Sequence, residues 1–361
     1  MIMMRMRVIK KKHIMNETFD IAIYGGTMSN NFGGALTYYA LYRAFCDMGM
    51  NTVIIPPNPD RHGIVMTDNI FYKHCNVAPN FHINGQEYKF NTLSDIFVVG
   101  SDQMWNYKLF DEWGLNPYLD FISDDKKKYT YSVSMGTYDL SKNENKDKIY
   151  DLLHKFKSIS VREPYAQKIL KDNFDISSEV LIDPVFLCDN TVYDELINEC
   201  NVNYGGEYAF IYDLGLNKTH IENIQNVNDS LGIKEIFVQT GNFLKIKEAE
   251  LCDRNLQNVL SGISVSEWLK LIKNAEYVIT NSFHGICFSI LFKKNFVVMG
   301  SIDERKMNIL QICDLLDRVA ITSNPNEIRT VLSTPIKYED VFTKLQPHIE
   351  KGKEFILKIK K

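Results

Sequence analysis

A histidine between an apolar strand and an apolar helix is the side chain best placed to do chemistry. The apolar run 277–279 stops at polar residues 280–282, and a second apolar run with helical spacing begins after His284 and Gly285. This pattern predicts a buried strand that leads through a short loop into a helix. Free N–H groups and the positive end of the helix dipole favour anions at such a corner. An imidazole there suits acid–base chemistry on a phosphorylated or carboxylated ligand; the alternative is a structural histidine in a turn.

Cationic side chains follow two other predicted strands. Arg162 comes directly after the apolar segment 158–161, where a cation is costly unless it pairs with Glu163 or with a ligand carboxylate. Arg305 and Lys306 follow the strand that ends at Met299. Together with His284 they predict a site for a small dianion or trianion, although each residue alone also has a structural explanation.

Two polar segments indicate a sugar ligand. Residues 100–106 bring Ser101, Asp102, Gln103 and Trp105 to one strand end, which offers polar groups for hydroxyls and an aromatic face for a ring. The alternative is a capped turn with a buried tryptophan. The glycine-rich loop 25–34 is neither a dinucleotide fingerprint nor a phosphate loop. Its Asn31 and Gly33 suit a sugar hydroxyl or an anion, or simply begin a helix.

The elements that position these residues alternate along the chain. Strands are predicted at 19–24, 52–55, 96–99, 129–133, 158–161, 208–212, 236–238, 277–279 and 296–299, and helices at 35–48, 165–171, 220–231, 265–272 and 307–316. Alternation of this kind indicates the α/β class with parallel sheets. We expect two doubly wound, Rossmann-like domains that face each other across a cleft, with ligands bound outside the carboxyl ends of the strands.

The predicted boundaries follow shifts in composition. We expect a basic, disordered arm at 1–16, an N-terminal Rossmann-like domain at 17–188, a linker at 189–206 and a C-terminal Rossmann-like domain at 207–340. A basic amphipathic helix at 341–361 closes the chain. Such a helix can lie on an anionic membrane, or it can pack its apolar stripe on the protein, which we favour.

Composition excludes several classes of function. The net charge of −4 gives no electrostatic case for nucleic acid. The seven cysteines are scattered without a Cys-x-x-Cys pair, which indicates reduced thiols and no zinc site. No segment has the length of about 20 apolar residues that spans a bilayer, and the N-terminus lacks the apolar core of a secretion signal. We therefore expect a cytoplasmic protein, with peripheral association at the inner face of the membrane as an option.

With these residues in place, the chain resembles the polysaccharide pyruvyl transferase family over roughly residues 21–316. Gly-Ser-Asp-Gln-x-Trp-Asn and Ser-Phe-His-Gly are the specific matches, whereas the glycine corner is weak by itself. The landmarks in chain order are Asn31-x-Gly33, residues 100–106, Ser134-x-Gly136, residues 160–163, Asp183-Pro184-Val185 and residues 280–285.

The resemblance implies a fold like that of GT-B glycosyltransferases and a specific reaction. Pyruvate would move from phosphoenolpyruvate to two hydroxyls of one sugar, forming a cyclic ketal in capsular, exopolysaccharide or cell-wall glycan synthesis. His284 looks like the family's catalytic histidine and Arg162 like its anion-binding arginine. Ser282, Gly285 and either Arg305 or Lys306 would bind the donor, with the acceptor at Asn31, Gly33, Ser101, Asp102, Gln103 and Trp105. Neither a metal nor a cofactor is required, since phosphoenolpyruvate is a co-substrate.

Two other functions remain open from the sequence. A GT-B glycosyltransferase that uses a nucleotide sugar would share the architecture, but we find no base- or ribose-binding groups in the second domain. The third hypothesis is a non-catalytic protein of glycan assembly. For the transferase, the acceptor is either a sugar or a lipid-linked oligosaccharide, and the sequence identifies neither the sugar nor the hydroxyls used.

Overall fold

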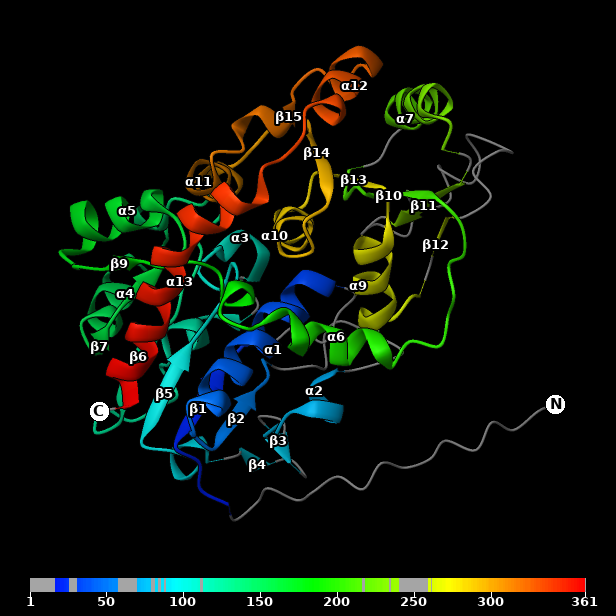
Figure 1. Ribbon diagram of the computed structural model, residues 1–361. Helices are drawn as coiled ribbons and strands as arrows, with labels where there is room; N and C mark the ends of the chain where they lie inside the picture. The colour runs from blue at the N-terminus through cyan, green and yellow to red at the C-terminus, as the bar shows by residue number, and fades with distance from the viewer. Residues whose placement is uncertain are drawn as a thin grey trace.

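The first of two parallel sheets lies in the N-terminal half (Figure 1). The computed structural model describes residues 17–25, 31–57, 70–78, 82–83, 86–87, 89–110, 113–215, 218–233, 235–239, 259–260 and 262–360. The order of this sheet is β2-β1-β5-β6-β7, from β1 (Ile21–Tyr24), β2 (Thr52–Ile55), β5 (Ile96–Val99), β6 (Lys127–Thr130) and β7 (Phe156–Ser158). Continuous apolar runs form the strands β1, β2 and β5, whereas β6 and β7 are more polar and partly exposed.

The second parallel sheet lies in the C-terminal half. Its order is β12-β11-β10-β13-β14-β15, from β10 (Tyr208–Tyr212), β11 (Glu235–Gln239), β12 (Val259–Leu260), β13 (Tyr277–Thr280), β14 (Asn295–Met299) and β15 (Val319–Ala320). Two doubly wound α/β units are therefore confirmed. The strand expected at 129–133 ends earlier, at Thr130, and Val133 makes only single bridges to Asp102 and Val161.

Helices of both halves meet between the sheets. Helix α1 (Phe32–Asp47) packs on α9 (Val265–Asn274) and on α10 (Phe283–Leu291). Phe32 in its first turn stacks on Trp268, with ring centroids 5.7 Å apart. The far face of the second sheet is covered by α7 (Lys218–Leu231) and α12 (Pro325–Ser333), which lie side by side in Figure 1. One hydrophobic core thus joins the two halves, and a smaller one lies under α7 and α12.

Shorter elements complete the two halves. They are α2 (Ile70–His74), β3 (His82–Ile83), β4 (Gln86–Glu87), α3 (Tyr107–Phe110), α4 (Lys146–Leu153), β8 (Ser160–Val161), α5 (Pro164–Phe174), β9 (Glu179–Val180) and α11 (Glu304–Cys313). A 3-10 turn, η6 (Pro184–Phe186), packs on α1. The arm expected at 1–16 lies outside the described residues.

The segment expected as a linker is partly helical. Helix α6 (Asn190–Asn198) occupies the first half of 189–206 and packs on α9 of the C-terminal half. Val192, Tyr193, Leu196 and Ile197 form its buried face. The spacing of these four apolar residues explains the helix, which the high polar content of the segment obscured. Only the stretch after residue 199 is irregular.

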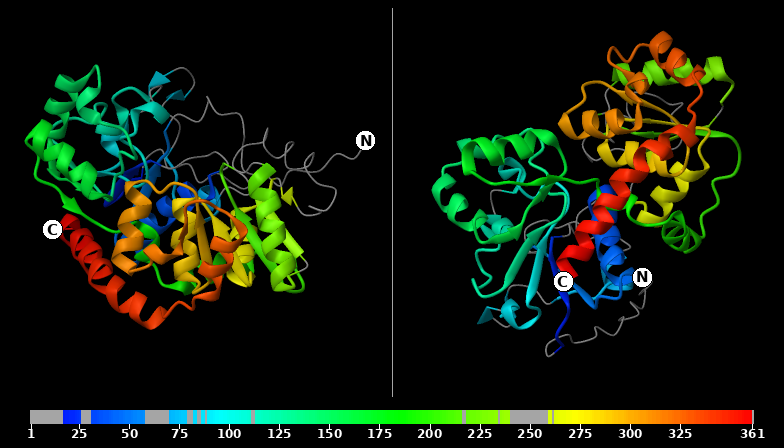
Figure 2. Two further views of the ribbon diagram at one scale, coloured as in Figure 1. Left: turned by 90° about the horizontal axis from the view of Figure 1, so that it is seen from above. Right: turned by 60° about the vertical axis from the view of Figure 1, so that its left-hand side comes forward.

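The last helix returns to the first sheet. Helix α13 (Tyr338–Lys360) begins three residues before the expected position and runs diagonally across both lobes (Figure 2, right). Phe355 meets Tyr131 edge-to-face at 6.1 Å, and Lys360 Nζ donates to the Met48 carbonyl at 2.9 Å. Its apolar stripe is therefore buried on the protein, which is the alternative we favoured over a membrane surface. Among the described residues, no helix is long and apolar enough to cross a bilayer.

Strand order determines where a site can form. The direction of winding reverses between β1 and β5 in the first sheet and between β10 and β13 in the second. Crevices for ligands open at such switch points, outside the carboxyl ends of the strands. Asn31 and Ser101 lie in the loops leaving β1 and β5, and His284 lies in the first turn of α10, directly after the loop that leaves β13. The topology thus brings three of the predicted site segments to these switch points.

Candidate active site

The imidazole of His284 faces a buried carboxylate from the other half of the chain. His284 is the second residue of α10 and is only 5% exposed. Its Nε2 lies 3.5 Å from Asp183 Oδ2. Thr37 Oγ1 and the Val185 N–H donate to the other carboxylate oxygen, Asp183 Oδ1, at 2.8 and 3.0 Å. Asp183 is fixed by these bonds and can therefore orient the imidazole.

The positive charge of Arg162 offsets the cost of burying the Asp183 carboxylate. Its Nη2 lies 2.7 Å from Asp183 Oδ2. Burial alone would raise the pKa of the Asp183 carboxyl, but the Arg162 charge and then the His284 ring outweigh burial and lower this pKa far below its usual range. Asp183 therefore stays ionised between an arginine and a histidine.

The remaining contacts of Arg162 also involve protein atoms. Nη2 donates to Ser101 Oγ at 2.9 Å, and Nη1 lies 3.4 Å from Asp102 Oδ1. The sequence offered Glu163 or a ligand carboxylate as its partner, whereas the structure pairs Arg162 with Asp183 and Asp102. The guanidinium is 2% exposed, and its Nε is buried without a hydrogen-bond partner among the described residues. Arg162 therefore positions Asp183 through its Nη atoms, and its expected contact with a ligand stays a prediction.

The start of α1 touches the imidazole directly. A Cβ atom built on Gly33 would lie 2.2 Å from His284 Nδ1. Only glycine therefore allows this approach of the helix to the ring. Asn31 is the N-cap of α1, and its Oδ1 accepts from the Gly34 N–H at 2.9 Å. The structure thus gives both acceptor candidates a local role, Gly33 against the histidine and Asn31 as a cap.

A second arginine shares an aromatic ring with Arg162. The guanidinium carbons of Arg162 and Arg305 lie 4.8 and 5.8 Å from the centre of the Phe283 ring. Such contacts hold cations next to an aromatic face. Arg305 Nη2 pairs with Asp303 Oδ2 at 2.7 Å, and the Arg305 side chain is 15% exposed. Arg305 is thus the more accessible of the two arginines.

Lys306 is used differently from Arg305. Its Nζ donates to the carbonyls of Ser301 and Asn281, at 2.9 and 3.3 Å. Burial lowers the pKa of its ammonium, while Asp303 opposes this change. Lys306 therefore joins the loops that leave β13 and β14, and Arg305 is the better candidate for a ligand anion.

The N-terminus of α10 has the predicted shape. Ser282 is its N-cap, with Oγ 3.5 Å from the Gly285 N–H. The helix begins at Phe283, two residues before the expected start at Gly285. A Cβ on Gly285 would lie 2.3 Å from Thr280 Oγ1, so glycine permits close packing of the helix on its own strand. The N–H groups of Phe283 and His284 have no partner inside the helix and suit an anion.

The segment 100–106 is buried more deeply than a sugar-binding loop would be. Ser101 Oγ donates to the Ser132 carbonyl at 2.7 Å, and Gln103 Oε1 accepts from Asn106 Nδ2 at 2.9 Å. Trp105 is 1% exposed, stacks on Tyr118 and donates its indole N–H to the Pro117 carbonyl. Trp105 is therefore a core residue, and the expectation that it offers an aromatic face to a sugar is corrected.

A buried glutamate adds a titrating group beside the arginines. Glu163 Oε1 accepts from the Met135 N–H and from Ser134 Oγ, at 2.8 and 3.0 Å. Burial raises the pKa of its carboxyl to about 7, against the Arg162 charge and both hydrogen bonds. Glu163 Oε2 and Arg305 Nε are buried without a hydrogen-bond partner in the part of the chain that the structure describes.

Glu163→Gln is expected to remove a pH dependence of stability. Because the pKa is higher in the folded state, folded wild type binds more protons than the unfolded chain between the two pKa values, and its free energy of unfolding falls as pH rises. The difference between 4.5 and about 7 corresponds to about 3 kcal/mol. The free energy of unfolding of Glu163→Gln, measured in urea, should rise relative to that of wild type by about 2–3 kcal/mol as the pH increases from 4.5 to 8. Parallel pH profiles would contradict the buried ionisation.

Sequence comparison decides the family. The profile of the polysaccharide pyruvyl transferase family matches residues 31–303, which include α1, the loops after β5 and β13, and α10. This chain belongs to the polysaccharide pyruvyl transferase family. A search of curated protein sequences found no significant relative.

Solved structures show which fold this pyruvyl transferase family member has. A UDP-GlcNAc 2-epimerase from Neisseria meningitidis, bound to UDP-GlcNAc, is 11% identical, with a TM-score of 0.61 over 94% of this chain and 99% of the other. A putative UDP-N-acetylglucosamine 2-epimerase from Listeria monocytogenes is 12% identical, with a TM-score of 0.59 over 94% and 95%. The wall teichoic acid polymerase TagF is 10% identical, with a TM-score of 0.53 over 97% and 90%. The predicted GT-B-like fold is confirmed.

Two residues of the candidate site were not among the predicted site residues. Asp183 bridges Arg162 and His284, and Phe283 lies under both arginines. Asp183 had a visible signal, since it follows the apolar pair Leu181-Ile182 and precedes a proline. Its pairing with His284 spans about a hundred positions of sequence, and no local pattern reports such a contact.

Proposed function

We propose that this protein transfers pyruvate from phosphoenolpyruvate to two hydroxyls of a sugar, forming a cyclic ketal. The observation that carries the proposal is the contact between His284 of one half and Asp183 of the other, beside Arg305 and the first turn of α10. An oriented imidazole next to cations and free helix N–H groups suits a reaction that needs a proton and releases an anion. Membership of the family agrees with this chemistry.

Asp183 determines which nitrogen of His284 reacts. Nε2 lies 3.5 Å from Asp183 Oδ2, and neither atom has a hydrogen-bond partner among the described residues. We therefore assign the Nε2–H tautomer, in which Nε2 can donate to this oxygen, and this leaves Nδ1 to exchange protons. Nδ1 is the nitrogen next to Gly33 at the start of α1. We therefore place the reacting carbon and the acceptor hydroxyls near this end of α1, where the sequence suggested Asn31 and Gly33 for the acceptor.

The steps balance with one acid–base group. Protonation of the methylene carbon of phosphoenolpyruvate makes its central carbon cationic, and one sugar hydroxyl forms a C–O bond to it and loses its proton. The bond from this carbon to the phosphate oxygen then breaks and inorganic phosphate leaves. The second hydroxyl forms the other C–O bond and gives up its proton, which closes the ketal. His284 Nδ1 supplies the first proton and is reprotonated by one hydroxyl, and the proton of the other hydroxyl leaves with the phosphate as hydrogen phosphate.

Arg305 and α10 hold the anionic groups of the donor in this proposal. Arg305 is more exposed than Arg162, and its Nε has no hydrogen-bond partner among the described residues. Buried polar atoms are normally paired, so this N–H is available to a carboxylate or phosphate oxygen. The N–H groups of Phe283 and His284 would stabilise the phosphate as its charge grows.

Donor binding can be tested before the acceptor is identified. Phosphoenolpyruvate at about 100 times its dissociation constant should stabilise the wild type by about 2.7 kcal/mol in thermal unfolding. Arg305→Ala should lose most of this shift, because it removes the accessible cation. Arg329→Ala, an arginine on the surface of α12, is the matched control and should keep it. A nucleotide sugar that stabilises the protein while phosphoenolpyruvate does not would favour the glycosyltransferase alternative.

The acceptor class follows from the family. We propose a sugar unit of a capsular, extracellular or cell-wall glycan, either free or carried on a lipid. Because α13 buries its apolar stripe against both halves, membrane recruitment by insertion of that helix finds no support in the structure. A lipid-linked acceptor would bring its own anchor, and a cytoplasmic enzyme would meet it at the inner face of the membrane.

A further inference from the structure

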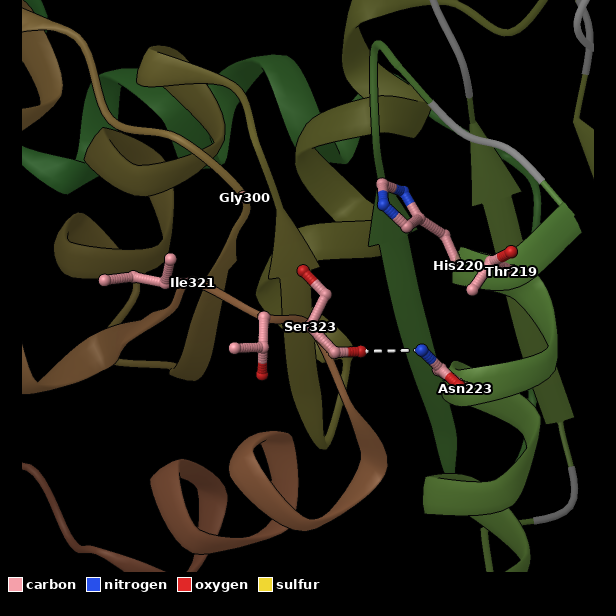
Figure 3. Close-up of a pocket in the computed structure, with 7 residues that line it drawn as sticks. Thr219, His220, Asn223, Gly300, Ile321 and Ser323 are labelled. Atoms are coloured by element: carbon pink, nitrogen blue, oxygen red, sulfur yellow. Dashed lines mark hydrogen bonds between the residues drawn. The ribbon is translucent and has the colours of Figure 1, made fainter.

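A cavity separate from the His284 corner opens at the same edge of the second sheet. Its volume is about 430 Å³, which lies within the usual range of about 300–1,000 Å³ for small-molecule sites. The first turn of α7, the end of β14 at Gly300 and the loop between β15 and α12 form its walls (Figure 3). We call it the α7–α12 cavity.

The walls of the α7–α12 cavity are polar but carry no strong charge. The hydroxyl-bearing residues Thr219, Thr322 and Ser323 line it, with Asn223 and His220. The hydroxyls of Thr322 and Ser323 also donate to the Glu327 carboxylate and to the Ala320 carbonyl. Its seven lining residues include no lysine or arginine. A diphosphate normally requires such cations or a bidentate guanidinium. The lining therefore suits neutral hydroxyls better than a nucleotide.

An apolar side chain lies among these hydroxyls. Ile321 is 74% exposed, an unusual exposure for so large an apolar residue. Sugars combine hydroxyl edges with C–H faces and methyl groups, so a binding site for them pairs hydrogen-bonding groups with an apolar contact. Asn223 also fixes the shape of the site, because its Nδ2 donates to the Ser323 carbonyl at 2.8 Å and joins α7 to the opposite wall (Figure 3).

A chain of contacts connects the α7–α12 cavity with the catalytic corner. His220 Nδ1 lies 3.0 Å from Asp213 Oδ2, and Asp213 is fully buried. Asn281 donates its amide to Asp213 Oδ1 and accepts from the Leu214 N–H at 2.8 Å. Asn281 directly precedes the N-cap of α10. The cavity and His284 are therefore anchored to neighbouring strand ends, β10 and β13, on opposite faces of one sheet.

We propose that the α7–α12 cavity binds a neutral sugar unit of the acceptor, distinct from the unit that receives pyruvate. That this sugar is part of the acceptor rests on the proposed function, whereas the binding of a sugar to the cavity does not depend on that function. An acceptor that reaches from the α1 end of the His284 corner to the cavity has more than one sugar. The enzyme would then select an oligosaccharide by a unit that takes no part in the reaction.

Saturation-transfer NMR on the full chain tests the binding directly. The probes are the methyl glycosides of galactose, mannose, glucose and N-acetylglucosamine, with uridine monophosphate as the charged comparison. Thr219→Trp places a bulky side chain in the cavity from an exposed position of α7. Asp229→Trp, exposed in the last turn of the same helix, is the matched control. We expect saturation of at least one glycoside by wild type and Asp229→Trp, and at least fivefold less by Thr219→Trp.

The possible results separate this inference from the proposed function. Equal saturation in all three proteins, or none from any glycoside, would overturn the sugar site. If uridine monophosphate binds wild type and Thr219→Trp abolishes this binding, the cavity is a nucleotide site instead. Stabilisation by phosphoenolpyruvate is measured separately on the same proteins, so its failure would count against the donor and leave the sugar result standing. Unchanged thermal unfolding of Thr219→Trp confirms that the variant is folded.

Discussion

His284→Ala is expected to lower turnover by about 10²- to 10⁴-fold, which is the usual contribution of a general acid–base group. The variant lacks the only imidazole that faces Asp183 among the described residues. Phosphate release from phosphoenolpyruvate in the presence of acceptor measures the loss. Donor binding should persist, because Arg305 and the first turn of α10 remain.

Because His284 is buried, the controls must show that His284→Ala is still folded. Since His284 packs on Gly33, alanine leaves a small cavity, and circular dichroism with thermal unfolding must show a folded protein. His154→Ala removes a histidine at the exposed end of α4 and should retain wild-type turnover. Wild-type rates in folded His284→Ala would exclude the histidine from catalysis and favour a non-catalytic role in glycan assembly.

Asp183→Ala is expected to destabilise the fold by about 3–5 kcal/mol, the usual cost of breaking a buried ion pair. Of its two ion pairs among the described residues, Arg162, 2% exposed, would keep the one with Asp102 at 3.4 Å. Thr37 and the Val185 N–H would also lose their acceptor. The free energy of unfolding in urea measures this loss.

A double variant separates the buried charge from lost packing. Arg162→Leu combined with Asp183→Ala removes both charges and should recover part of the stability lost in Asp183→Ala. Asp172→Ala breaks an exposed pair with Lys168 and should be nearly silent. If the double variant is as unstable as the sum of the single variants, the two charges are not coupled. Recovered stability without recovered turnover is the expected outcome, because nothing then orients His284.

The sequence predicted the architecture well because local patterns encode it. Apolar runs between loops identified most strands of both sheets, and the alternation with helices gave the parallel topology. Where a predicted helix boundary differs from the structure, the cause is local. Helix α6 is amphipathic within a polar segment, and α1 begins at Phe32 because Asn31 supplies the cap that the glycine-rich loop concealed.

The site was only partly predictable, for a physical reason. Residue type and position at a strand end identified His284 and Arg162 as neighbours of one site. Which partner each would take depends on contacts between segments remote in sequence, such as Asp183 with both of them. Burial of Trp105 likewise depends on Tyr118 and on the Pro117 carbonyl. A strand end that looks open in the sequence can be covered in this way.

The return of α13 to the first sheet has a consequence for how this chain is made. Phe355 and Lys360 complete the packing of a unit whose first strand begins at Ile21. The N-terminal unit therefore cannot reach its native packing while the ribosome is still adding residues of the C-terminal unit. Its apolar surface beside Tyr131 stays uncovered until residues 338–360 have been made and can pack on it.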